Sequence, residues 1–268
     1  MTRRLTIWLL ILLPYNSFGQ HWQLVKQVEF GEVDKFTLDQ VGNIYVANLQ
    51  GEVAKYSPVG ELMVEYAPTQ VAGIHEITAS TQFKVSLFYK DLQEFVVLNR
   101  YLSSPIRYRL PDFRLGYVEE VAPNFQQALW ALDISDFALK LVDFRENRLL
   151  EQKSLAQVLD RNLADIVSFH SHQNRMYVID KSSGIHVFDN IGNYMFKLME
   201  KTPSSTRFNK DYLYYRKDGY LNLIHLYEGE DLKLSVQELD FTRLAYGNDR
   251  LVAITPKGFN IYKYLSGQ

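Results

Sequence analysis

Short apolar runs recur along the chain with a period near 42 residues, and this repetition constrains the fold more than any other feature. Residues 34–61 contain alternating runs separated by Gly, Asn and Asp turn residues. The same pattern returns at 176–192, where Tyr177 lies three periods of 44 residues after Tyr45. Short alternating runs between turn residues are typical of antiparallel strands. Units of four such strands repeating every 40–45 residues predict an all-β fold, a β-propeller.

The number of blades follows from the spacing of one apolar residue in the innermost strand of each repeat. These markers are Phe36, Ile77, Val121, Val167, Phe208 and Leu244. The 24 residues after Leu244 and the 16 residues between Gly19 and Phe36 together make one period. We therefore predict six four-stranded antiparallel blades, with the N-terminal strand closing the last blade as its outer strand. Closure removes an open seam where unpaired strand edges would invite aggregation. Five or seven blades remain alternatives.

The first residues have the pattern of a secretory signal. Arg3 and Arg4 precede an apolar run over residues 5–13, and small residues stand at Ser17 and Gly19. A basic start, a short apolar run and small residues at −3 and −1 predict a cleavable signal. The run is shorter than the roughly 20 residues that a membrane span needs.

Residues 1–19 are therefore predicted to be a signal peptide, and residues 20–268 a single propeller domain. We expect an exported protein, periplasmic or extracellular, with no membrane span in the mature chain. An uncleaved N-terminal anchor is the alternative.

Charge and cysteine content exclude several classes of function. The 29 basic and 31 acidic residues leave a net charge of −2, so no global basic surface favours nucleic-acid binding. The absence of cysteine excludes disulfides, thiolate metal sites and thiol catalysis.

One segment has helical rather than strand periodicity. Residues 154–163 carry apolar side chains at 155, 158, 159 and 163, about one helical face, and Ser154 could cap the start. We expect a helix between blades 3 and 4, either packed on the surface or lying over the channel.

The first repeat resembles a known family of propellers. Residues 39–48, which begin Asp-Gln-Val-Gly-Asn, together with Val53, Tyr56 and Gly60, resemble a repeat of the NHL-like six-bladed propellers. The resemblance is good over 34–61 and fair over 176–192. It implies the fold and says little about activity, because the family includes interaction scaffolds, sensor domains and some calcium- or zinc-dependent enzymes. Blades 2, 3, 5 and 6 lack the Asp-x-x-Gly-Asn turn. No functional site of the family is therefore assigned to residues of this chain.

Charged residues precede the markers, and their signs are segregated around the predicted ring. The residues just before the six markers are Lys35, Glu76, Glu120, Ile166, Arg207 and Arg243. Acidic residues fall in blades 2 and 3, and basic residues in blades 5, 6 and 1. Lys35, Glu76, Glu120, Arg207 and Arg243 are therefore predicted to line a polarised binding mouth, near the loops that carry Asn48, Asp133 and Asp180. The alternative is a ring of ion pairs that orders neighbouring blades, because charges near a packed axis persist mainly by pairing.

Metal binding is a second possibility for the same region. Glu76, Glu119, Glu120 and Asp165 could supply oxygen ligands to calcium, although no Asp-x-Asp-x-Asp-Gly loop is present. His170 and His172 are interpreted as a polar strand end, since two histidines alone do not make a zinc site. No Gly-x-Ser-x-Gly nucleophile motif occurs.

The sequence thus predicts an exported binding or scaffold propeller that recognises a protein, peptide or small charged ligand at the loop face around the channel. We expect a protein or peptide partner in the cell envelope, a monomeric chain and no required cofactor, with calcium possible. Catalysis is not favoured. The alternative function is a metal-dependent hydrolase or lyase that uses the channel carboxylates.

Overall fold

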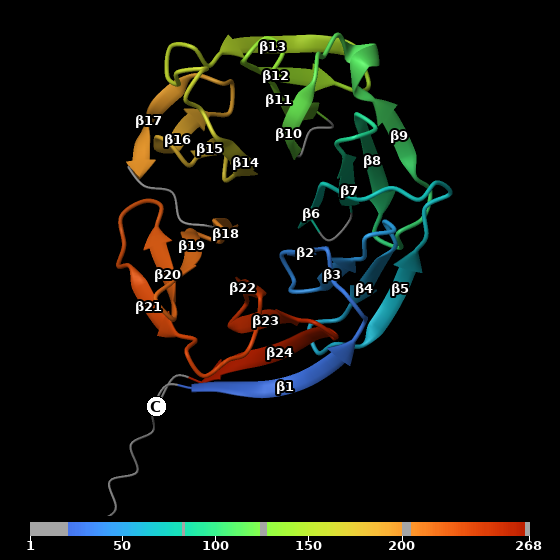
Figure 1. Ribbon diagram of the computed structural model, residues 1–268, viewed down its shortest axis with the longest axis vertical. Helices are drawn as coiled ribbons and strands as arrows, with labels where there is room; N and C mark the ends of the chain where they lie inside the picture. The colour runs from blue at the N-terminus through green and yellow to red at the C-terminus, as the bar shows by residue number, and fades with distance from the viewer. Residues whose placement is uncertain (1–20, 82–83, 124–127, 200–204, 266–268) are drawn as a thin grey trace, which may run out of the picture.

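Six four-stranded antiparallel sheets are arranged around a central axis, as Figure 1 shows. The computed structural model describes residues 21–81, 84–123, 128–199 and 205–265. The predicted signal peptide, residues 1–19, lies outside the described residues. The architecture confirms the six-bladed all-β propeller.

Blades 1 to 3 each consist of four consecutive strands. Blade 1 contains β2 (Lys35–Leu38), β3 (Ile44–Ala47), β4 (Val53–Tyr56) and β5 (Leu62–Tyr66). Blade 2 contains β6 (Glu76–Thr81), β7 (Lys84–Tyr89), β8 (Glu94–Asn99) and β9 (Ile106–Arg109), followed by a 3₁₀ turn, η1 (Leu110–Phe113). Blade 3 contains β10 (Val118–Pro123), β11 (Ala128–Asp133), β12 (Ala138–Asp143) and β13 (Arg148–Ser154).

Blades 4 and 5 repeat this order, and blade 6 combines the two ends of the described chain. Blade 4 contains β14 (Ile166–His172), β15 (Arg175–Asp180), β16 (Gly184–Asp189) and β17 (Tyr194–Met199). Blade 5 contains β18 (Arg207–Asn209), β19 (Tyr212–Lys217), β20 (Tyr220–His225) and β21 (Leu232–Ser235). Blade 6 contains β22 (Arg243–Gly247), β23 (Arg250–Thr255), β24 (Gly258–Leu265) and β1 (His21–Glu29).

The ring closes where β1 pairs with β24. The two strands are antiparallel from His21 opposite Leu265 to Glu29 opposite Gly258, with one irregularity between Leu24 and Lys26. They lie side by side along one edge of the ring in Figure 1. Blade 6 therefore takes its outer strand from the start of the described chain and its inner three strands from the end.

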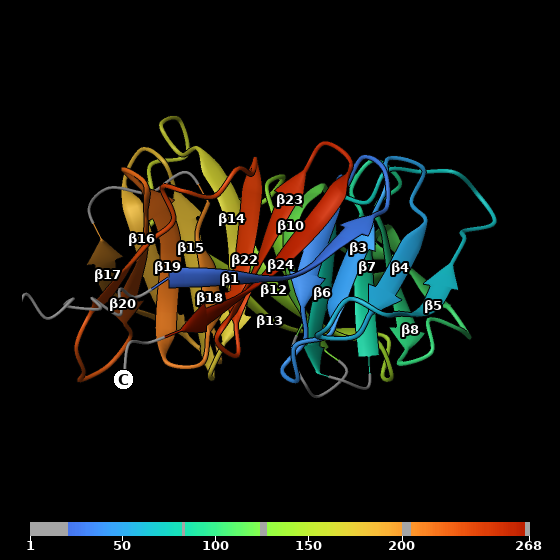
Figure 2. The same cartoon turned by 90° about the horizontal axis from the view of Figure 1, so that it is seen from below.

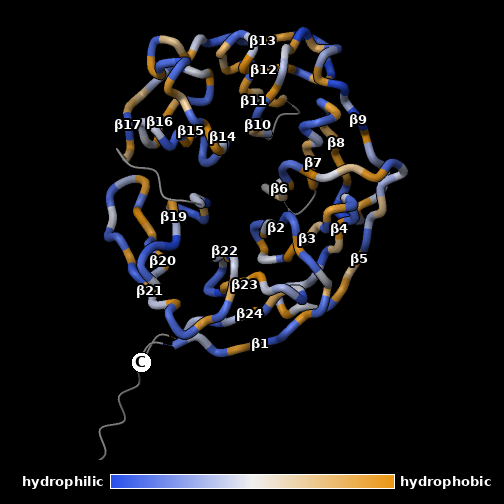
Figure 3. Tube along the Cα trace, in the orientation of Figure 1, coloured by the Kyte–Doolittle hydropathy of each residue, from blue (hydrophilic) through white to orange (hydrophobic). Residues whose placement is uncertain are grey.

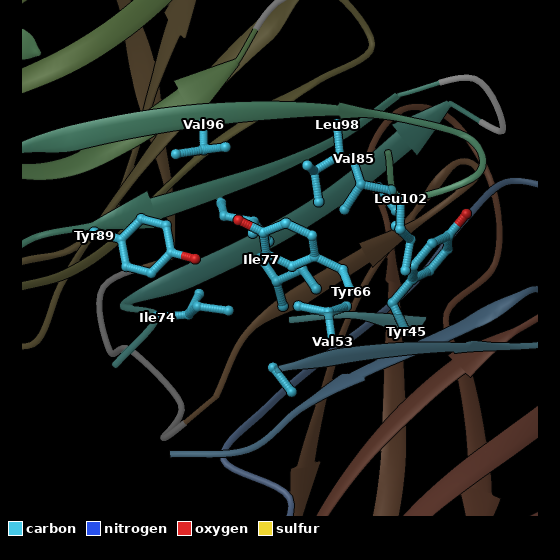
Figure 4. Packing of buried hydrophobic residues seen from close by; sticks show 13 residues of the cluster. Tyr45, Val53, Tyr66, Ile74, Ile77, Val85, Tyr89, Val96, Leu98 and Leu102 are labelled. Carbon is cyan, nitrogen blue, oxygen red and sulfur yellow. The ribbon is translucent and has the colours of Figure 1, made fainter. Parts of the chain in front are cut away.

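Apolar residues between neighbouring sheets form the core. Apolar and polar residues are interspersed along the strands, as the tube in Figure 3 shows. Since successive side chains of a strand point to opposite faces, an apolar face can pack on the next blade. Between blades 1 and 2, Tyr45, Val53, Ile77, Val85 and Leu98 belong to one buried cluster, drawn in Figure 4. Burial of such residues stabilises the contact between adjacent blades by about 25 cal/mol for each Å² of apolar surface removed from water.

The Asp-x-x-Gly-Asn motif forms a hydrogen-bonded turn in two blades. Asp39 accepts hydrogen bonds from the backbone N–H of Val41 at 3.0 Å and of Asn43 at 2.9 Å, while Gly42 adopts a φ of +89°. Asp189 accepts the equivalent bond from the backbone of Asn193 at 2.8 Å. A carboxylate two to four residues before its donors and a glycine at positive φ stabilise a tight reversal. The motif is thus a structural device of the blades.

The predicted helix over residues 154–163 is absent from the structure. β13 extends to Ser154, and turns follow, with Leu159 N–H donating to Leu155 O at 2.8 Å and Ala164 N–H donating to Asp160 O at 2.9 Å. Leu155 and Leu159 are buried against blades 3 and 4. A single turn, closed by the bond between Leu159 and Leu155, places both leucines in the core as one helical face would, which explains why the periodicity was misleading. None of the described residues forms a helix long and apolar enough to cross a membrane.

Closure of the ring can be tested at Trp22 on β1. Its indole N–H donates to Ser235 O at 2.7 Å, and its ring packs on Tyr264 at 4.9 Å. Trp22→Ala should lower the free energy of unfolding by about 2 kcal/mol, or ~4–8 °C in melting temperature, since it removes both contacts. Leu24→Ala on the same strand, where the side chain is 46% exposed, should change the melting temperature little. Equal effects would contradict a specific closing role for Trp22.

Candidate functional site

The five charged residues predicted at the channel mouth line one cavity. Lys35, Glu76, Arg207 and Arg243 are the first residues of the inner strands β2, β6, β18 and β22, and Glu120 lies on the inner strand β10. All five border a cavity of about 590 Å³. The inner strands surround the axis in Figure 1 and run along it in Figure 2, so residues near their N-terminal ends converge. The structure therefore brings these residues together, and a binding role for them stays a prediction.

The two arginines of the basic wall are anchored on blade 1. Arg243 donates to the carbonyl oxygens of Val33 and Asp34. Arg207 donates to Phe36 O at 3.3 Å. Both guanidinium groups also lie over the Phe36 ring, at 4.4 Å for Arg207 and 5.4 Å for Arg243. Among the described residues, neither guanidinium lies within 4.0 Å of a carboxylate, so their positive charge is oriented without being neutralised by an ion pair.

Of the two glutamates of the acidic wall, one bonds a histidine and the other has no ion-pair partner among the described residues. Glu120 is buried and bonds His75 at 2.9 Å, which joins blades 2 and 3. Burial, and after it the carboxylate of Glu120, raise the pKa of Glu76 well above its usual value, although Arg207 and Lys35 oppose this shift. Oε2 of Glu76 is buried and has no hydrogen-bond partner among the described residues, whereas Oε1 accepts a bond from the Thr78 hydroxyl at 3.5 Å. Glu76 thus keeps its proton to a higher pH than an ordinary glutamate does.

His170 is a channel residue that the sequence interpretation missed. It borders the mouth cavity and a second cavity beyond it, and its buried Nε2 has no hydrogen-bond partner. Burial, with smaller contributions from Arg207 and His172, lowers the pKa of His170 to about 4, so the ring is neutral near pH 7. His172, by contrast, is a strand-end residue whose Nε2 bonds Lys210 O at 2.6 Å.

The reason for the miss is the register of β14. A bulge separates Ile166 from Ser168, so Ser168 lies opposite Ile179 just as Glu120 lies opposite Leu132 in blade 3. The sequence marker for blade 4, Val167, is 36% exposed, and the packed residue is Phe169. Counting by two from Ser168 would have placed His170 on the channel face.

The structure separates the four carboxylates considered as calcium ligands. Only Glu76 and Glu120 border the mouth. Glu119, the neighbour of Glu120 on the strand, pairs with Lys90 instead. Asp165 is exposed and pairs with Lys181 at 3.6 Å. Within the described ranges, no group of three or more His, Asp or Glu side chains is placed to hold a metal ion.

A second cavity of about 530 Å³ adjoins the mouth on the far side of the channel. Both cavities share Glu76, Ile77, His170 and Arg207, which we call the waist. The far cavity is lined largely by the next channel-facing residue of each inner strand: Thr37, Thr78, Ala122, His170, Asn209 and Ala245. The channel thus passes from a charged mouth through the waist to a chamber in which these six inner-strand positions carry no acidic or basic residue other than His170, while Asp39 and Lys210 border it from turns.

The loop carboxylates expected near the mouth have a structural role. Asp133 is fully buried and accepts hydrogen bonds from Gly116 N–H and from Lys140 Nζ, both at 2.7 Å. Burial by itself would raise the pKa of Asp133, but these hydrogen bonds outweigh it and hold the pKa below its usual value. Asp180 is equally buried and accepts a bond from Asp165 N–H at 3.0 Å. Each carboxylate ties the start of an inner strand to the following hairpin.

Replacing Asp133 should therefore cost stability rather than ligand binding. Asp133→Asn should lower the free energy of unfolding by about 2 kcal/mol at pH 7, because buried Lys140 loses a charged partner. Because its pKa is lowered in the folded state, the stabilisation is present above an unfolded pKa of about 3.9 and disappears as pH falls through the folded value. Urea titrations at pH 7 and pH 3 measure both effects.

Asp143→Asn is the matched control, since Asp143 accepts similar turn bonds from Arg145 N–H at 2.7 Å and Glu146 N–H at 3.1 Å but is not paired with a buried lysine. An equal loss in the two variants would show that the turn, and not the buried pair, provides the stability.

Comparison with solved structures supports the fold. The β-propeller domain of Cps50 (Swd1) from Myceliophteria thermophila has a TM-score of 0.59 and 9% identity, over 91% of this chain and 99% of that chain. Virginiamycin B lyase from Staphylococcus aureus, in a catalytically inactive form with quinupristin, has a TM-score of 0.55 and 10% identity, over 88% of this chain and 82% of that chain. A streptogramin B lyase has a TM-score of 0.55 and 10% identity, over 93% of this chain and 88% of that chain. At these identities the similarity shows a shared propeller fold alone. No family model and no curated protein matches the sequence.

Proposed function

We propose that this chain is an exported, non-catalytic binding propeller that recognises the carboxylate of a small charged ligand or peptide end at the channel mouth. One observation carries the proposal: charged residues from five blades surround a single cavity, with opposite signs on opposite walls. The cavity volume of about 590 Å³ lies within the ~300–1,000 Å³ usual for ligand sites. A peptide end would come from a protein partner in the cell envelope.

The basic wall supplies the recognition of a carboxylate. Arg207 uses one N–H on Phe36 O, and its other donors make no hydrogen bond within the described part of the chain. A guanidinium presents five donors in a planar fork that fits a carboxylate in a bidentate manner. Its orientation is already fixed by Phe36, so little side-chain entropy is lost on binding.

The opposite wall suits the positive end of a zwitterion. Glu120 is the acidic residue of that wall that has a partner, and its 2.9 Å contact with His75 holds it in place. An ammonium group on the ligand would gain a charge-assisted hydrogen bond there. We do not favour the metal-dependent hydrolase or lyase, because the carboxylates that would hold the ion are divided between the mouth and two outward ion pairs.

Removing the guanidinium tests the proposal. Arg207→Gln should weaken binding of a zwitterionic dipeptide such as Ala-Ala by about 10–100-fold, the value of a lost charge-assisted hydrogen bond of ~1.5–3 kcal/mol. The C-terminal amide of the same dipeptide should bind weakly to both proteins. Isothermal titration calorimetry on the 20–268 chain measures these affinities.

Arg148→Gln serves as the matched control. Arg148 is exposed on the outer strand β13 and pairs with Glu146, which precedes that strand. This variant should leave affinity unchanged. Unchanged affinity in Arg207→Gln, with only stability altered, would instead support an ordering role for the basic wall.

Cleavage of the predicted signal peptide can be tested through the mass of the mature protein. If residues 1–19 are a signal peptide, the mature protein should begin at Gln20, and intact-mass spectrometry of the protein recovered from outside the cytoplasm should give the mass of residues 20–268. Recovery of a chain that still carries Met1 from the membrane fraction would favour an uncleaved anchor.

A further inference from the structure

Two buried polar atoms at the waist lack a partner. Oε2 of Glu76 and Nε2 of His170 make no hydrogen bond with the described protein, and both residues border the mouth cavity and the far chamber. Most buried polar groups in proteins are hydrogen-bonded, and an exception beside a cavity calls for an explanation. Arg207 lies at the same level, with most of its donors unused. These three side chains come from β6, β14 and β18 and face a common space.

The charge of the waist favours a group with a single negative charge. Arg207 supplies one positive charge, while burial keeps Glu76 protonated above its usual pKa and His170 neutral above a pKa of about 4. Other titratable or cationic groups facing these residues are Lys35 on β2, His75 before β6, Glu120 on β10, His172 on β14 and Arg243 on β22. Lys181 also borders the mouth, and Asp39, Lys210, Tyr214 and Tyr246 border the far chamber. Glu120 opposes any dianion placed next to Glu76.

The far chamber offers neutral hydrogen-bonding groups. The side chains of Thr37, Ser171 and Asn209 border it and form no hydrogen bond within the described residues. Phe208 and His172 stack at 5.1 Å and present flat rings to the same space. Hydroxyl, amide and ring surfaces together suit a hydroxylated, uncharged body, and a volume of about 530 Å³ accommodates a molecule the size of a sugar.

We infer that the waist binds the carboxylate of a hydroxylated organic acid, of the sugar-acid class, between the guanidinium of Arg207 and the acid form of Glu76, with the hydroxylated body in the far chamber. The carboxyl O–H of Glu76 donates to one oxygen of the ligand carboxylate, and Arg207 donates to the other. This inference rests on the proposed function, since it specifies which carboxylate ligand the channel binds and at what depth.

The arrangement predicts a pH signature. A ligand carboxylate next to Glu76 requires Glu76 to stay protonated, so binding should weaken by up to about tenfold per pH unit once Glu76 loses its proton. D-glucuronate is the probe, because its carboxylate stays ionised across this range; D-glucose is the neutral comparison, and D-glucarate, whose two carboxylates are both ionised across this range, is the dianionic comparison. Titration calorimetry from pH 5 to pH 9 should show glucuronate affinity falling with pH, with both comparisons binding at least tenfold more weakly at pH 6.

Glu76→Gln separates a role for Glu76 from a general pH effect. The amide keeps a donor for the ligand but cannot ionise, so glucuronate binding at pH 6 should stay within about threefold while the fall at high pH disappears. Because this variant retains His75 and His172, pH dependence that arises from either histidine would survive in it. Glu61→Gln, in an exposed turn, is the control and should keep the wild-type profile.

A second variant tests the chamber without touching Glu76. Asn209→Leu should weaken glucuronate at least tenfold and leave acetate, which has no body to place there, unchanged. A flat wild-type profile, an unchanged profile in Glu76→Gln, equal binding of glucarate or equal loss of acetate in Asn209→Leu would each overturn the inference. If Ala-Ala binds through Arg207 and glucuronate does not bind, the sugar-acid inference is wrong while the proposed function stands. If no carboxylate binds, the proposed function fails with it.

Discussion

The pairing of β1 with β24 is the constraint on which the channel depends. Each blade buries its faces against two neighbours, so an open ring would leave two blade faces and a row of strand edges in water. By adding the start of the described chain to the last blade, the fold links the ends of the sequence through one antiparallel sheet. Only a closed ring holds six inner strands at a common distance from the axis. The channel residues, which come from every blade, take their mutual positions from that closure.

A ring built this way buries charges within its sheets as well as along its axis, where solvation is reduced, and each charge is accommodated differently. Asp133 and Lys140 form a buried pair with extra backbone bonds, which is the arrangement that keeps paired charges tolerable inside a protein. Arg243 and Arg207 lie instead on carbonyl oxygens and on Phe36. Carbonyl dipoles fix a guanidinium and partly replace its hydration without cancelling its charge. The mouth therefore keeps a positive wall that an anion can neutralise, whereas a ring of ion pairs would leave none.

Repetition made the fold predictable, and local departures from it limited prediction of the site. The marker spacing located all six inner strands, because burial between blades imposes the same apolar position in each. It also gathered Lys35, Glu76, Glu120, Arg207 and Arg243 at one mouth. In blade 4 the marker was placed at Val167, whereas the residue in the register of Val121 is Phe169, two positions later. The inner strands of blades 3 and 4 share a bulge at the same place, and a bulge has no fixed signature in a single sequence. The misplaced marker hid His170 and misplaced Asp165. The apolar spacing of residues 154–163 was equally ambiguous, since one turn buries Leu155 and Leu159 as a helix would.

The protonation state of the waist is a property of the assembled ring and of no single repeat. In the sequence, Glu76 is a glutamate one residue before an apolar marker. Its neighbours along the chain do not predict a raised pKa. Burial by neighbouring blades and the carboxylate of Glu120, held in place by His75, raise its pKa, while Arg207 across the channel only partly offsets them. His170 becomes neutral by the same burial. Closure thus shifts two titratable side chains toward their neutral, hydrogen-bonding forms beside a fixed cation. In the inferred site, these groups would receive a ligand carboxylate, and Glu120 would disfavour a second negative charge beside Glu76.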